Sequence, residues 1–337
     1  MYTFAILNPR NIPAAIEAND KLFTKPVYGI EVTVPALAKR CIGNLDPQHS
    51  GGDANRAAIE DAMTAELPAE GTILATVRAD LDAVGAMCIL NLQAEGKSLK
   101  PAMGRINLIA VSDKFARGGW PGPKPLPTRD NPWNEETATA ESSRPLAAIA
   151  AAVMDFRVSL AERVYTMLQW LFNGEEPEQY RAEVVRARVE MVLALEGGKI
   201  SSKMVASRCG NTGKVRRSSF YCEHCGGDAN PSYLCWDSPL IVVVESTYRA
   251  ATTVGYHLAP VVVALNPEFR FQGGESHRKF TVCQFTADYV DLRSALVELA
   301  ELEPGWGGSP PIGGSPQGVS SALTTDQVVE VVIRHLR

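Results

Sequence analysis

TVRADLDAVGAM, the stretch from Thr76 to Met87, is the most informative part of this sequence of 337 residues. It follows an apolar run over residues 73–77 that predicts a buried strand, and it precedes a helix start rich in small residues. Asp80 and Asp82 therefore come just past the end of a strand, two residues apart. Like charges this close raise each other's pKa, which favours a compensating divalent metal ion. The alternative is a solvated loop in which an aspartate caps the helix.

The pattern around this stretch predicts a parallel sheet. Strand-like and helix-like segments alternate over the first ~115 residues, as in βαβ units. In such sheets, ligands bind outside the carboxyl ends of the strands. The predicted strands cover residues 2–7, 28–34, 73–77 and 106–111, and the predicted helices cover residues 54–66 and 83–95.

Two more acidic segments follow predicted strands. Asp46 and His49 occur in LDPQHSGGD, and Asp113 follows the strand predicted over 106–111. Together with the two aspartates of TVRADLDAVGAM they form a set of carboxylates and one imidazole, which suits Mn²⁺ or Mg²⁺ better than Zn²⁺. Taken singly, His49 is as well explained by a loop histidine bonded to the main chain, and Asp113 by a helix or turn cap.

The rest of the chain predicts a second domain. We expect an α/β fold of two αβ domains with mainly parallel sheets, joined by a helical connector. The first domain covers residues 1–145 and the connector 146–198, with one helix ending near Asn173 and a second from Pro177 to the glycines at 197–198. The second domain, over 199–337, has predicted strands at 240–246, 259–267 and 279–285, helices at 291–303 and 325–336, and a cysteine-rich insertion at 207–237.

Residues 117–145 show no periodicity. They contain six prolines together with Trp120 and Trp133. A loop this long is typical of a lid, a clamp or a linker, and the alternative is a surface excursion anchored by its tryptophans.

A glycine-rich segment over 304–318 precedes the last predicted helix. Glycine frees main-chain N–H groups to face an anion, so phosphate binding is one interpretation, and a structural turn is the other. The residues predicted to contact substrate are Gly307, Gly308, Gly313, Gly314 and Ser315.

Four of the seven cysteines cluster in the predicted insertion: Cys209, Cys222, Cys225 and Cys235. The pair in CEHC has the spacing of a zinc knuckle, and two flanking cysteines complete a tetrahedral set. We therefore expect a structural Zn²⁺ that holds an insertion without its own core.

Composition excludes several classes of function. The net charge of −5 provides no overall attraction to nucleic acid. The N-terminus lacks a basic region followed by a long apolar core, and the longest apolar run, nine residues over 146–154, is too short to cross a bilayer. We expect a cytoplasmic protein without membrane contact. GxSxG, GxGxxG and Walker motifs are absent from the sequence.

These motifs resemble those of the DHH phosphoesterase superfamily. The run from Arg78 to Ala86 is similar to its first motif, a strand followed by His-x-Asp-x-Asp-Ala-hydrophobic-Gly-Ser, but lacks the His and the Ser. Asp113 is similar to the Asp of the second motif, although no Asp-His-His follows it. The glycine-rich segment stands where the family's associated C-terminal substrate domain carries a GGGH-type loop, here without its His.

The resemblance implies a manganese-dependent enzyme that acts on phosphodiesters, pyrophosphate or nucleotides. Asp46, His49, Asp80, Asp82 and Asp113 would hold Mn²⁺ or Mg²⁺ and carry catalysis. Arg78 would bind the substrate phosphate, since a guanidinium cannot ligate a metal but pairs well with phosphate.

Three functions therefore remain. The first is a metal-dependent phosphoesterase acting on a nucleotide, an oligonucleotide or another phosphate ester. The second is a non-catalytic protein that binds a nucleotide or a short nucleic acid at a degenerate DHH-like site. The third is a zinc-stabilised interaction protein. A homodimer is a further expectation.

Overall fold

The chain divides into two compact units. In this computed structural model they comprise residues 1–116 with 138–186, and residues 117–137 with 187–337. The structure describes residues 2–10, 12–47, 56–115, 118–133, 143–210, 212–217, 238–248, 251–270, 275–316 and 318–337. The α/β class predicted from the sequence is confirmed.

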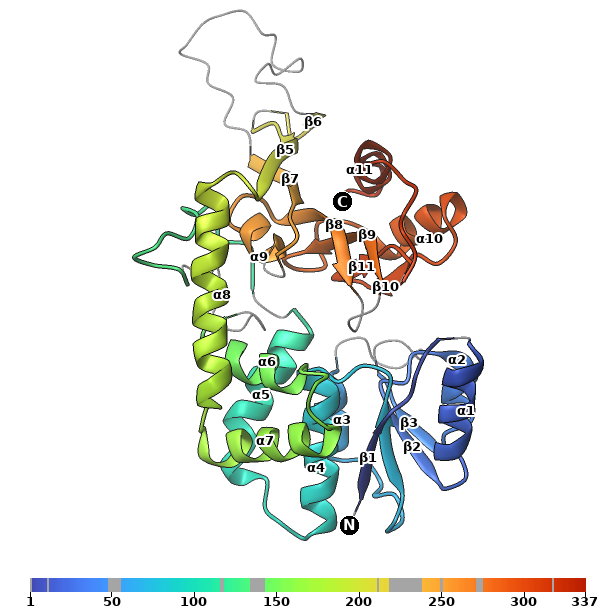
Figure 1. The fold of residues 1–337 in the computed structure, drawn as a ribbon. Helices are drawn as coiled ribbons and strands as arrows, with labels where there is room; N and C mark the ends of the chain where they lie inside the picture. Colours follow the sequence, from blue (N-terminus) through green and yellow to red (C-terminus); the bar gives the residue numbers. More distant parts are fainter. Residues whose placement is uncertain are drawn as a thin grey trace, which may run out of the picture. The chain divides into compact units, whose positions relative to one another are not determined.

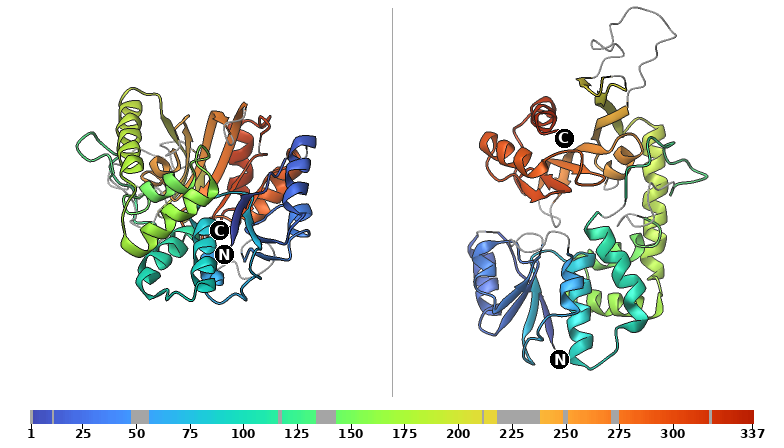
Figure 2. Two further views of the ribbon diagram at one scale, coloured as in Figure 1. Left: turned by 60° about the horizontal axis from the view of Figure 1, so that its bottom comes forward. Right: turned by 180° about the vertical axis from the view of Figure 1, so that it is seen from behind.

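The first unit is built on a parallel sheet of four strands, in the order β1-β4-β2-β3. The strands are β1 (Thr3–Ile6), β2 (Val27–Ile30), β3 (Gly43–Leu45) and β4 (Ile73–Thr76). Helices α1 (Pro13–Leu22) and α2 (Pro35–Ala38) lie on one side of it, and α3 (Ala58–Ala62) and α4 (Leu81–Ala94) on the other (Figures 1 and 2).

Helix α4 is the centre of this unit's larger core. Twelve consecutive residues, Leu81 to Leu92, are buried, because α4 packs against β2 and against α3, α5, α6 and α7. A helix that is apolar on all sides is stable only when it is enclosed in this way. The remaining helices are η1 (Lys100–Ala102), α5 (Met103–Asp113), α6 (Ala147–Val153), α7 (Leu160–Asn173) and α8 (Glu178–Glu196), and the boundary between the units falls within α8.

Two sequence predictions are wrong in this unit. Residues 106–111 form part of helix α5 rather than a strand, with Ile106, Ile109 and Ala110 buried at helical spacing. A short apolar run cannot distinguish a strand from a buried helix. The helix predicted to run from residue 146 to Asn173 is broken into α6 and α7, because Ser159 starts a new helix with a capping box closed by Glu162.

The second unit contains a mixed sheet of seven strands, in the order β10-β11-β9-β8-β7-β5-β6. The strands predicted over 240–246 and 259–267 are β7 (Ser238–Glu245) and β8 (Val261–Arg270), which are parallel neighbours. The other pairings are antiparallel. The remaining elements are β5 (Ser201–Arg208), β6 (Val215–Arg217), α9 (Ala251–Tyr256), β9 (Ser276–Gln284), α10 (Leu292–Leu302), β10 (Gly307–Ser309), β11 (Ile312–Gly314) and α11 (Thr325–Arg334).

The proline-rich segment, where it is described, packs on this second unit. The Trp120 indole donates a hydrogen bond to the main-chain oxygen of Tyr256 at 2.8 Å, and the Lys124 main-chain N–H donates to that of His257, also at 2.8 Å. The Arg188 guanidinium lies 4.8 Å from the centre of the Trp133 ring, in a cation–π contact. None of the helices that the structure describes is long and apolar enough to cross a bilayer.

A test of the first unit concerns Asp155, which lies in the break between α6 and α7. Its carboxylate accepts hydrogen bonds from the main chain and guanidinium of Arg157 and from the Tyr180 hydroxyl. The bonds from Arg157 hold the pKa of Asp155 below its usual range. This stabilisation is present at neutral pH and is lost as the pH falls from about 4 toward the lowered pKa.

We therefore expect Asp155→Asn to lower the free energy of unfolding by about 1–2 kcal/mol at pH 7, and by less at pH 3, where part of this stabilisation is already lost. Urea denaturation at the two pH values measures the difference. Asp20→Asn, which alters an exposed pair with Arg40, is the control. A loss in Asp155→Asn that is the same at both pH values would contradict this account.

Candidate functional site

Carboxylates gather where the strands of the parallel sheet end. Glu31 directly follows β2, Asp46 directly follows β3, and Asp80 is the N-cap of α4 after β4. Because all four strands are parallel, their carboxyl ends lie at the same edge of the sheet (Figure 1). This is the edge where ligands of open α/β sheets bind.

Asp80 caps helix α4, and its carboxylate makes one further contact, with Arg78. Its Oδ1 accepts the main-chain N–H of Ala83 at 3.1 Å, which caps α4. Its Oδ2 lies 3.6 Å from Nε of Arg78, whose side chain is 66% exposed. The carboxylate is thus held in place by one cap bond and one loose ion pair.

Asp82 is engaged more completely. It is buried, and its two oxygens accept the main-chain N–H groups of Ala58 at 2.7 Å and Ile59 at 2.9 Å. These donors are at the N-terminus of α3, where a carboxylate also meets the favourable end of the helix dipole. Asp82 therefore joins α3 to α4, a structural role that the Asp-x-Asp pattern did not predict.

Asp113 reaches the same region from a helix. It is the last residue of α5, not the residue after a strand. Its charge nevertheless raises the pKa of Asp82, although burial of Asp82 is the larger cause and the bonds from α3 oppose it. Asp113 therefore interacts electrostatically with Asp82, even though the strand predicted before it does not exist.

Glu31 is the site residue that the sequence analysis missed, because it was placed inside the strand predicted over 28–34. Burial raises its pKa well above the ordinary value. The negative charges of four other carboxylates raise this pKa further. In decreasing order of effect, they are Asp80, Asp82, Asp113 and Asp46. We refer to the five carboxylates that these electrostatic interactions link as the carboxylate cluster: Glu31, Asp46, Asp80, Asp82 and Asp113.

The main chain at Glu31 is also unusual. Its φ of 51° is left-handed, a conformation that costs a residue other than glycine about 1 kcal/mol or more. Its N–H donates to the main-chain oxygen of Leu45 at 2.8 Å, which holds the bend in place. Strained residues of this kind are found most often at functional sites.

The cluster has the donor chemistry of a Mn²⁺ or Mg²⁺ site, since carboxylate oxygens are the ligands these ions prefer. Carboxylates near one another repel, and this repulsion adds to the effect of burial on the pKa of Glu31. Among the described residues, however, no three His, Cys, Asp or Glu side chains are already arranged to hold a metal ion. The predicted ligand His49 lies outside the described residues.

The glycine-rich residues form a hairpin in the second unit. Gly307 and Gly308 pair with Gly314 and Gly313 across β10 and β11, and β11 pairs with β9. A Cβ atom on Gly308 would lie 2.3 Å from the main-chain oxygen of Ile312, so close packing requires glycine there.

Packing also explains the residues next to the hairpin. A Cβ atom on Gly314 would lie 2.7 Å from the main-chain oxygen of Phe280 and 3.3 Å from Nζ of Lys279. The Ser315 hydroxyl accepts the Phe280 N–H at 3.0 Å, and Lys279 donates to the Ser315 main-chain oxygen. Phosphate binding by these residues stays a prediction.

The structure describes one of the four predicted zinc ligands. Cys209 is buried just after β5, with its N–H bonded to the main-chain oxygen of Lys214 at 2.9 Å. Cys222, Cys225 and Cys235 lie outside the described residues, so the zinc site stays a prediction.

Comparisons with known proteins found similarity to solved structures but not to known sequences. No protein-family model matches the sequence, and no curated protein matches it. A solved structure titled "pGpG-specific phosphodiesterase - PggH from Vibrio cholrae" matches at 10% identity with a TM-score of 0.37, covering 92% of this chain and 98% of that chain. A similarity at this level does not establish a function, so the function is inferred from the chain's own residues.

Removing one charge from the cluster tests its electrostatics. We expect Glu31→Gln to raise the free energy of unfolding by about 1 kcal/mol in EDTA at pH 7, because glutamine keeps the shape and removes a repelled, half-buried charge. Chemical denaturation measures this, with the exposed Glu17→Gln as the control. Destabilisation by Glu31→Gln would show that its charge is compensated without a metal.

Proposed function

We propose that this chain is a divalent-metal-dependent phosphoesterase that acts on a nucleotide, an oligonucleotide or another phosphate ester. The observation that carries the proposal is the cluster of five electrostatically coupled carboxylates at the carboxyl edge of a parallel sheet. A protein keeps repelling charges together where a function requires them, because they lower stability.

Each residue then has a distinct role. Glu31, Asp46, Asp80 and Asp113 would hold Mn²⁺ or Mg²⁺, with His49 as a further ligand. A bound divalent cation polarises a phosphoryl oxygen and makes water a better nucleophile. Side chains must rotate toward the cation as it binds, since the described ligands are not yet converged.

The neighbouring residues orient the ligands and the substrate. Asp82 fixes α3 against α4 through its two main-chain bonds, and the cap bond from Ala83 orients Asp80. The Arg78 guanidinium, which is exposed beside Asp80, would pair with a substrate phosphate. Its loose contact with Asp80 would be exchanged for the stronger contact with phosphate.

The competing function is a protein that binds a nucleotide or a short nucleic acid without catalysis. It is favoured by the finding that no three described side chains are arranged as a metal group. It also fits the missing His and Ser of the motif around Asp80. Hydrolysis that depends on a metal ion distinguishes the two functions.

Asp80→Asn is the sharpest test of catalysis. Asparagine caps a helix as well as aspartate does, so the variant keeps the bond to Ala83 while it removes one ligand charge. Asp82→Asn is less suitable, because it would also disturb the two bonds to α3. We expect Asp80→Asn to lower Mn²⁺-dependent hydrolysis by about 100-fold or more.

The assay uses a panel of phosphodiesters, cyclic nucleotides and pyrophosphate with added Mn²⁺. Asp20→Asn, the same substitution at an exposed ion pair with Arg40, should leave the rate unchanged. Absence of hydrolysis by the wild type across the panel would leave the binding protein as the better account.

Arg78→Ala tests the phosphate contact. We expect KM to rise about tenfold or more with kcat little changed, because the lost charged hydrogen bonds contribute about 1.5–3 kcal/mol to binding. Arg40→Ala, which removes an exposed arginine from the same unit, serves as the control. An equal fall in kcat with unchanged KM would assign Arg78 to the transition state instead.

A further inference from the structure

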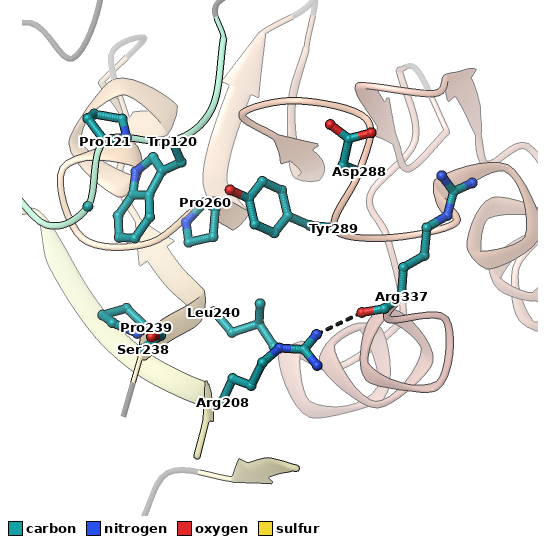
Figure 3. A pocket seen from close by; sticks show the side chains of 11 residues that line it. Trp120, Pro121, Arg208, Ser238, Pro239, Leu240, Pro260, Asp288, Tyr289 and Arg337 are labelled. Atoms are coloured by element: carbon teal, nitrogen blue, oxygen red, sulfur yellow. Dashed lines mark hydrogen bonds between the residues drawn. The ribbon is translucent and has the colours of Figure 1, made fainter. Parts of the chain in front are cut away.

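The second unit contains a pocket with no assigned role. Its volume is about 520 Å³, within the range of sites for small molecules. None of the residues predicted to bind substrate or metal lines it. The pocket lies where β7 and β8 begin, and its lining is Trp120, Pro121, Gly122, Arg208, Ser238, Pro239, Leu240, Pro260, Asp288, Tyr289 and Arg337 (Figure 3).

Hydrogen bonds hold the two aromatic residues of the pocket in place. The indole of Trp120 is tied to the main-chain oxygen of Tyr256 at 2.8 Å. The loop that carries Tyr289 is held by the buried Gln284, whose side-chain oxygen accepts the Tyr289 N–H at 3.1 Å. Both residues are half-buried, so part of each side chain stays accessible to a ligand.

Arg208 brings a cation to the same pocket. It is half-buried, and its described hydrogen bonds go to main-chain oxygens, those of Gly213 at 3.2 Å and Arg337 at 2.7 Å. A guanidinium carries five N–H donors, so this arrangement holds Arg208 in place and leaves donors for a ligand.

The remaining polar groups complete the pocket's chemistry. The lining side chains carry two positive charges, on Arg208 and Arg337, and one negative charge, on Asp288. A planar ring can stack on tryptophan and tyrosine, a phosphate can accept from guanidinium groups, and a carboxylate can accept from a ring amino group. The lining thus combines aromatic rings with a few charged groups, a combination found in small-molecule sites.

We propose that this pocket binds a small phosphorylated molecule with a planar ring, of the nucleoside monophosphate class. The ring packs against Trp120 and Tyr289, and the phosphate accepts hydrogen bonds from Arg208. The site is distinct from the carboxylate cluster of the first unit, and it does not depend on the phosphoesterase proposal.

Calorimetry with AMP, in EDTA to exclude metal-dependent binding at the carboxylates, tests the proposal. Adenosine and inorganic phosphate are the matched probes, since each lacks one half of AMP. We expect AMP to bind, and adenosine and phosphate each to bind at least tenfold more weakly. Arg208→Ala should weaken AMP binding at least tenfold, and Tyr289→Leu should weaken it as well.

The control is Arg334→Ala, which removes an arginine that pairs with Glu298 on the same unit and does not line the pocket. It should change AMP affinity less than twofold. Circular dichroism of each variant shows whether it is folded, and Tyr289→Leu replaces Arg208→Ala if the latter is not. Absence of AMP binding, affinity equal to that of either half-molecule, or unchanged affinity in both pocket variants would overturn the proposal.

Discussion

Repulsion among the carboxylates of the cluster is the constraint on which the first unit depends. Asp46 and Asp82 are buried and the other three are half-buried, and burial strengthens their repulsion because a protein interior screens charge poorly. The main chain offsets part of this cost, since Asp82 accepts two N–H bonds from α3 and Asp80 accepts one from α4. The charge on Glu31 is left without such an offset in the described contacts, and a divalent cation would supply it.

The sequence predicted this edge from its strand ends. Asp46, Asp80 and Asp82 were predicted as site residues because parallel strands place their carboxyl ends together. Asp113 was included for a wrong reason, since the segment before it is a helix and its position depends on how α5 packs. Glu31 was missed because a left-handed bend ends β2 earlier than the apolar pattern suggests.

Packing sets the limits of prediction in the rest of the chain. Gly308 and Gly314 lie where main-chain and lysine atoms come too close for a side chain. A sequence pattern cannot distinguish such glycines from glycines that face an anion. The break between α6 and α7 was hidden in a continuous apolar pattern, although Ser159 and Glu162 form a capping box that was visible in the sequence. Three of the four predicted zinc ligands lie outside the described residues, so the role of that insertion rests on spacing alone.

The central claim is that the carboxylate cluster binds a divalent cation. The most direct measurement is an anomalous difference map from crystals of the wild-type protein soaked in Mn²⁺. The account predicts a manganese peak at the carboxyl edge of the parallel sheet, within coordination distance of Asp80 and of at least two other carboxylates of the cluster. A map with no peak there, in crystals that bind manganese elsewhere or not at all, would contradict it.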